Sequence, residues 1–140
     1  MSSILVDNLT GKTTAGSVTV TSEGGAATMQ MQQGLCKAWV NFNGNDTTIT
    51  PRDSFNVSGM LDDAAAGEYQ IQFTNNFNNN DYAPSGFVGH GANASGWVGG
   101  PNSQPDTDYG TDKLQISTFY QNAVEAEFDY VMTTIHGDLA

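Results

Sequence analysis

Residues 37–44, Lys-Ala-Trp-Val-Asn-Phe-Asn-Gly, constrain the fold of this chain more than any other stretch. Ala38, Val40 and Phe42 are alternate residues, so in a strand they share one face and Trp39 lies on the opposite face. Apolar side chains on both faces predict a strand that is covered on both sides. We therefore expect this strand to be the first core strand of a globular unit.

Alternation continues through the rest of the chain. Residues 68–73 show it best, because Tyr69, Ile71 and Phe73 alternate with polar residues, as in an antiparallel strand with one buried face. Further strands are expected at 47–50, 54–60, 87–89, 97–98, 114–120 and 124–135. Short strands with turn signals between them predict an all-β, antiparallel β-sandwich.

The same periodicity predicts which side chains fill the core. In the last strand, Ala126, Phe128, Tyr130 and Met132 are expected to share one face. The core anchors that we predict along the chain are Trp39, Val40, Phe42, Phe55, Tyr69, Ile71, Phe73 and Phe128.

The sequence divides into an N-terminal segment, 1–36, and a head domain, 37–140. The segment is expected to hold strands at 4–6 and 17–21 and a helix over 27–33 that ends near Gly34. Two short strands are marginal alone in water, so we expect this segment to anchor the chain and to pair with other copies of the chain as an oligomer; a floppy tail is the alternative. The predicted oligomer or docking residues are Ile4, Leu5, Val6, Val18, Val20, Met31 and Leu35.

The charge balance restricts the possible partners. The formal net charge is −11, with only 4 lysines and arginines in 140 residues, so binding to nucleic acid or to an anionic membrane is not expected. The single cysteine, Cys36, excludes an intrachain disulfide. The first residues lack the features of a signal peptide, and no apolar run is long enough to cross a membrane, so we expect assembly in a cytoplasm.

Residues 75–110 are rich in glycine and asparagine, and connections of this length are typically functional or disordered. Aromatic residues on such a segment are suited to stacking on sugars or to gripping a protein; the alternative is that they cover the end of the sandwich. We assign Phe87 to the core. The predicted ligand or receptor contacts are Tyr82, His90, Asn93, Trp97 and Tyr109.

No catalytic residue, metal ligand or cofactor is expected. Residues 106–112 are acidic, but the glycine falls at the fifth position and Ser117 stands where an EF-hand has glutamate, which leaves only a looser Ca²⁺ site as an alternative. His90 and His136 lack metal-ligand spacing. Carboxylates are numerous enough for a glycosidase, although the repeats of a long depolymerase are absent.

An ordered set of motifs resembles a module of bacteriophage tail-fibre and related structural proteins. The set comprises residues 37–44, 53–58, 69–73, 129–130 and 136–138, and residues 4–9 resemble the opening of short structural proteins of marine phages. The resemblance covers most of residues 33–138. The module ends in Phe-Gly-Asp where this chain has His136, and residues 89–112 do not match.

This resemblance implies a trimeric, β-rich virion appendage without enzymatic activity. The expected role is a short tail fibre or fibre tip that contributes to host attachment, assembled in the host cytoplasm. The expected partners are further copies of the chain, a tail adaptor or major capsid protein, and a host-surface glycan or protein. A capsid decoration or head-fibre protein and a stand-alone carbohydrate-binding module are the alternatives.

Overall fold

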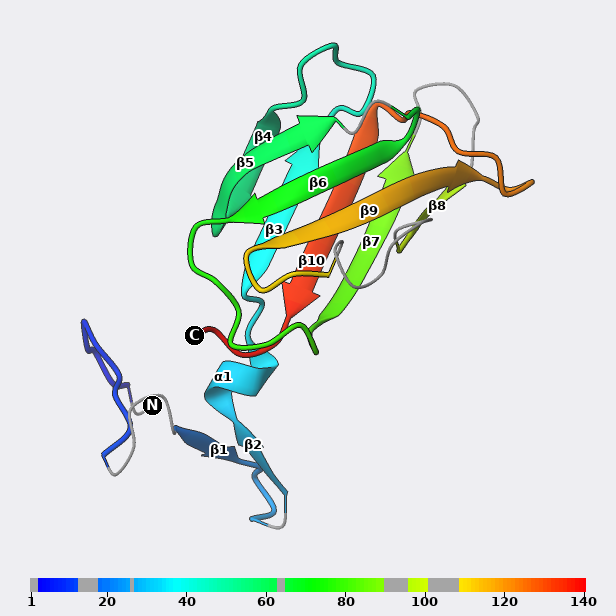
Figure 1. Ribbon diagram of the computed structural model, residues 1–140. Helices are drawn as coiled ribbons and strands as arrows, with labels where there is room; N and C mark the ends of the chain where they lie inside the picture. The colour runs from blue at the N-terminus through cyan, green and yellow to red at the C-terminus, as the bar shows by residue number, and fades with distance from the viewer. Residues whose placement is uncertain (1–2, 13–17, 26, 63–64, 90–95, 101–108) are drawn as a thin grey trace. The chain divides into compact units, whose positions relative to one another are not determined.

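The structure is a computed structural model that describes residues 3–12, 18–25, 27–62, 65–89, 96–100 and 109–140. Its strands pair antiparallel throughout, which confirms the all-β prediction. The chain forms two compact units, Met1–Leu35 and Cys36–Ala140 (Figure 1).

The N-terminal unit contains one small hairpin. Strand β1 (Thr19–Thr21) pairs with β2 (Thr28–Gln30), and helix α1 (Met31–Gly34) follows directly. The helix predicted over 27–33 is therefore wrong in its first half, because Thr28 to Gln30 find a backbone partner in β1. Residues 4–6 form no strand, although they were predicted to.

The C-terminal unit contains two four-stranded antiparallel sheets, which form two layers in Figure 1. The first sheet has the order β4 (Pro51–Phe55), β3 (Ala38–Phe42), β10 (Tyr130–His136), β7 (Ala83–Gly89). The second sheet has the order β5 (Val57–Asp62), β6 (Glu68–Phe73), β9 (Lys113–Tyr120), β8 (Gly96–Gly99). The two sheets share one hydrophobic core, as in a β-sandwich.

The core lies between the inner faces of the central strands. Phe42 from β3 packs edge-on against Tyr69 from β6, with ring centroids 4.9 Å apart. The Tyr69 hydroxyl donates to the Gly44 carbonyl oxygen at 3.1 Å, and burial raises the pKa of Tyr69 to about 12. Six of the predicted core anchors are buried here: Val40, Phe42, Tyr69, Ile71, Phe73 and Phe128.

A single residue carries the chain from the first sheet to the second. Asn56 stands alone between β4 and β5 and has a φ of 58°, a left-handed conformation that asparagine tolerates better than most residues. Its side chain accepts from the Asn75 backbone N–H at 2.7 Å and donates to the Asn75 carbonyl at 3.0 Å. The strand predicted over 54–60 is therefore two strands in different sheets.

Two other strand predictions need correction. Residues 47–50 form no strand, although Ile49 inserts into the core. The strand predicted over 124–135 begins only at Tyr130, and the alternation changes phase beside Asp129. Phe128 is buried, whereas Tyr130 and Met132, predicted to share its face, point outward.

Prolines stand in both edge strands of the first sheet. Pro51 opens β4, and Pro84 is the second residue of β7. Proline has no backbone N–H to donate, which is why it is tolerated at edges and blocks the addition of a further strand there.

Asn56 contributes to stability through its side-chain hydrogen bonds and through its tolerance of a left-handed backbone conformation. We expect two replacements of Asn56 to separate these contributions. Asn56→Gly keeps the left-handed conformation and loses the side-chain bonds, at a cost of about 1–2 kcal/mol in the free energy of unfolding. Asn56→Ala also strains the backbone and should cost about 1 kcal/mol more. Urea unfolding of the full chain measures both, and equal stability of the two variants would contradict a strained φ at this position.

Candidate functional site

The outer face of the first sheet carries several large apolar side chains. Pairing across the strands aligns them in two rows, because directly opposed residues point to the same side. One row is Phe55, Trp39, Thr134 and Ser85, and the next is Asp53, Asn41, Met132 and Phe87. Phe87 is 74% exposed, so this face leaves apolar surface in contact with solvent.

A hollow of about 250 Å³ opens on this outer face, and we call it the outer hollow. Thr134 on β10 and Ser85 on β7 are short, and Trp39, Met132 and Phe87 occupy neighbouring positions on the same outer face. Large side chains thus surround short ones, which is what makes the depression. Its lining residues are Trp39, Val40, Asn41, Ser85, Gly86, Phe87, Met132, Thr133 and Thr134.

The polar groups at the outer hollow are uncharged. The hydroxyls of Ser85 and Thr134 bond to each other at 2.9 Å, and each keeps further hydrogen-bonding capacity. The oxygen of the Asn41 side chain accepts from Arg52 at 3.5 Å, which turns the amide NH₂ away from Arg52. Arg52 also lies 4.4 Å from the centre of the Tyr130 ring, a cation–π contact that holds the guanidinium beside the hollow.

This face corrects three assignments made from the sequence. Trp39 lines the outer hollow and is only partly buried, so it is not a core anchor: among the described residues of the Cys36–Ala140 unit, no second sheet covers its face of β3. Phe55 is 52% exposed, because β4 turns it to the same face as Trp39. Phe87 was assigned to the core, yet the inward positions of β7 are Pro84, Gly86 and Val88.

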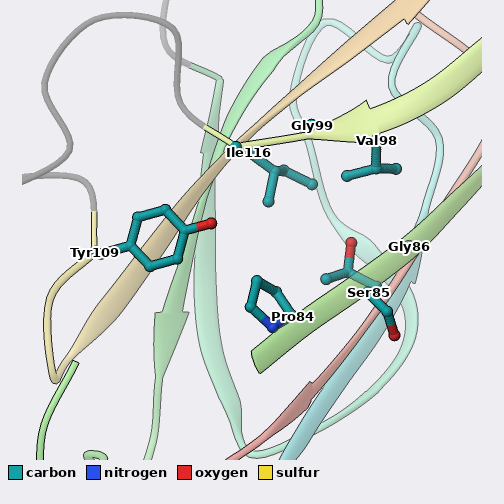
Figure 2. A pocket seen from close by; sticks show the side chains of 9 residues that line it. Pro84, Ser85, Gly86, Val98, Gly99, Tyr109 and Ile116 are labelled. Carbon is teal, nitrogen blue, oxygen red and sulfur yellow. The ribbon is translucent and has the colours of Figure 1, made fainter. Parts of the chain in front are cut away.

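A second hollow, the inter-sheet cleft, lies on the other side of β7. It measures about 120 Å³ and is lined by Pro84, Ser85, Gly86, Val98, Gly99, Gly100, Tyr109, Ile116 and Thr133. Figure 2 shows the Tyr109 hydroxyl directed into the cleft, with Pro84 and Val98 on different sides of it. Within the part of the chain that the structure describes, the buried Thr133 hydroxyl has no hydrogen-bond partner.

Gly86 explains why the two hollows lie back to back. A Cβ at this position would come within 2.8 Å of the Met132 carbonyl oxygen and 2.9 Å of the Val98 side chain. The edges of the two sheets can therefore approach closely only where β7 has no side chain. Ser85, Gly86 and Thr133 line both hollows.

Three of the predicted receptor contacts, Tyr82, Trp97 and Tyr109, are among the described residues. Tyr82 is buried, donates to the carbonyls of Gly110 at 3.1 Å and Lys113 at 2.9 Å, and is a core residue, not a contact. Burial raises the pKa of Tyr82 and of Tyr109, whose rings stack at 5.7 Å. Trp97, on β8, is 44% exposed beside Phe119. His90 and Asn93 lie outside the described residues.

Metal ligands and membrane spans were also sought in the described ranges. No group of three or more histidine, cysteine, aspartate or glutamate side chains is placed to hold a metal ion there. The acidic stretch 106–112 lies partly outside those ranges. In the same ranges, no helix has the length and hydrophobicity needed to span a bilayer.

The N-terminal unit exposes the apolar residues that were predicted to form an interface. Ile4 is 87% exposed and Leu5 94%, and both lie in a segment that forms no helix or strand among the described residues. Val6, Val20 and Leu35 are also exposed, whereas Val18 and Met31 are partly buried.

Comparison with known proteins found no family model, no curated protein and no solved structure that matches this chain. The outer hollow must therefore be interpreted from its own chemistry. It offers aromatic and thioether surface beside neutral hydrogen-bonding groups, a combination suited to non-covalent recognition.

We expect two neighbours on β3 to differ sharply in their effect on stability. Phe42→Ala removes a fully buried ring and should cost about 3–5 kcal/mol in the free energy of unfolding. Trp39→Ala removes a larger side chain from the outer face and should cost only about 1 kcal/mol. Chemical denaturation of both variants measures this difference, and a loss at Trp39 equal to that at Phe42 would mean that the outer face is covered.

Proposed function

We propose that this chain is a non-enzymatic structural protein of a bacteriophage virion, a short tail fibre or fibre tip that contributes to host attachment. The Cys36–Ala140 unit presents the outer face of its first sheet to a binding partner, and the Met1–Leu35 unit docks on another virion protein. The observation that carries this proposal is the outer hollow with its exposed apolar lining. Exposed apolar surface of this kind typically marks an interaction site on a soluble protein.

The proposal places the attachment to the virion in the N-terminal unit. Its apolar residues Ile4, Leu5 and Val6 are exposed, and burying them against a tail adaptor or a major capsid protein would remove about 25 cal/mol of unfavourable hydration per Å² of apolar surface. Residues 4–6 form no strand with any described residue, so they are available to pair with a strand of another chain. In this arrangement the protein is made in the host cytoplasm and is incorporated there into the virion.

We also propose that the chain is a homotrimer, as the resemblance to fibre modules implies. The two-stranded hairpin β1–β2 is too small to be stable by itself, and its residue Val20 is exposed in the single chain. Equivalent hairpins around a three-fold axis would bury these side chains against one another.

The proposed trimer predicts the mass that the protein has in solution. Light scattering of the purified full chain at micromolar concentration should give three times the mass of one chain, and Val20→Asp should shift this distribution toward monomer because it places a charge in the interface. Ser22→Asp, which adds the same charge to the neighbouring loop, is the matched control. A stable, folded monomer at that concentration would contradict the proposed trimer.

The division of roles between the two units predicts two different defects in virions. Deleting residues 3–25 should prevent incorporation of the protein into particles, as measured by mass spectrometry of purified virions. Phe87→Ala should leave incorporation unchanged and reduce attachment to host cells about tenfold. Leu61→Ala, an equally simple truncation of a residue that is 50% exposed on the second sheet, is the control. If the Phe87→Ala protein is not incorporated into virions and the protein lacking residues 3–25 is incorporated, the proposed roles of the two units are reversed.

A further inference from the structure

We propose that the outer hollow binds a neutral hexopyranose unit of a surface polysaccharide. This inference rests on the proposed attachment function and names the chemistry of its partner. The ligand class follows from three features of the hollow: the spacing of its aromatic rings, the nature of its polar groups and the absence of ionisable side chains in its lining.

The first feature is the arrangement of the rings. Trp39 on β3 and Phe87 on β7 stand on strands that are separated by β10, and these two strands are about 10 Å apart. The short side chains of Thr134 and Ser85 continue the row of Trp39, while Met132 of β10 lies directly opposite Phe87 in the next row. A pyranose ring can therefore lie over Thr134 and Ser85 and place its C–H groups against Trp39 and against Met132 and Phe87.

The second feature is the polar floor and rim. A pyranose carries C–H groups on its faces and hydroxyls around its edge, so a matching site must offer both apolar walls and groups that donate and accept. The Ser85 and Thr134 hydroxyls do both, and the Asn41 NH₂ group donates because its oxygen is turned toward Arg52. A purely aliphatic ligand would leave these groups without partners, which is costly.

The third feature is charge. None of the nine lining residues is ionisable, and on the surrounding surface Arg52 and Asp53 are neighbours of opposite sign. The whole chain carries a net charge of −11, which repels anionic sugars, and the hollow itself has no carboxylate to bind a cation. An uncharged sugar is not repelled by the net charge and does not need a carboxylate as a partner. Pro51 and Pro84 in the edge strands also oppose the addition of a protein strand beside this face.

The two tryptophans of the chain make a direct test possible. Trp97 lies on the second sheet, so Trp97→Phe leaves Trp39 as the one fluorescent indole, positioned in the outer hollow. This full-length variant is titrated with the methyl glycosides of glucose, galactose, mannose and N-acetylglucosamine, and with glucuronate as the anionic comparison. We expect a saturable change in Trp39 emission with at least one neutral glycoside and none with glucuronate.

Adding Phe87→Ala to this background should weaken binding at least about tenfold, while adding Leu61→Ala should not change it. Phe87 is 74% exposed, so its truncation does not threaten the fold, and thermal unfolding of the variant verifies this. Absence of a response to all four neutral glycosides would overturn the proposal, as would a response to glucuronate alone or a response that survives Phe87→Ala. If no sugar binds and Phe87→Ala still reduces attachment of virions, the attachment function stands and its partner is a protein.

Discussion

The strict alternation of side chains in β3 and β10 is the constraint on which this structure depends. Val40 and Phe42 on β3, and Val131 and Ile135 on β10, must all face the second sheet for the core to close. A strand slipped by one residue would exchange the two faces completely. Once these positions are buried, Trp39 and Met132 have to face outward, so the packing of the core itself creates the outer hollow.

Aromatic packing completes the core beside the connection from β6 to β7. Phe77 lies outside the strands and packs against Phe73 at 4.8 Å and against Tyr82 at 4.6 Å, and Tyr82 stacks on Tyr109. The hydroxyl of Tyr82 lies within hydrogen-bonding distance of two carbonyls at the start of β9, those of Gly110 and Lys113, and shares its proton between them. Tyr82 and Tyr109, which were expected to meet a receptor, therefore join the segment before β7 to the segment before β9.

Alternation was sufficient to predict most of the core and the all-β class, because Tyr69, Ile71 and Phe73 repeat without a break. It failed where one residue leaves the pattern. Asn56 divides what reads as a single strand, and the irregularity at Asp129 shifts the phase of β10. Neither break has a glycine or proline to mark it.

Phe87 shows a different reason for failure. A large aromatic residue in a strand is expected to face inward, but close approach between β7 and β8 leaves room only for Gly86 there. The hydrophobic residue is displaced to the outer face by a steric limit that involves another strand. For Trp39, the sequence shows that its side chain lies on the face of the strand opposite to Val40 and Phe42. It does not show whether a second layer of the protein covers that face.

The prolines of the edge strands have a consequence for crowded assemblies. Open sheets held side by side tend to join edge to edge into continuous ribbons, and the danger grows with local concentration. Pro51 and Pro84 interrupt that process at both borders of the first sheet. Copies of the domain that are held close together can then remain separate, each with its aromatic face open to the solution.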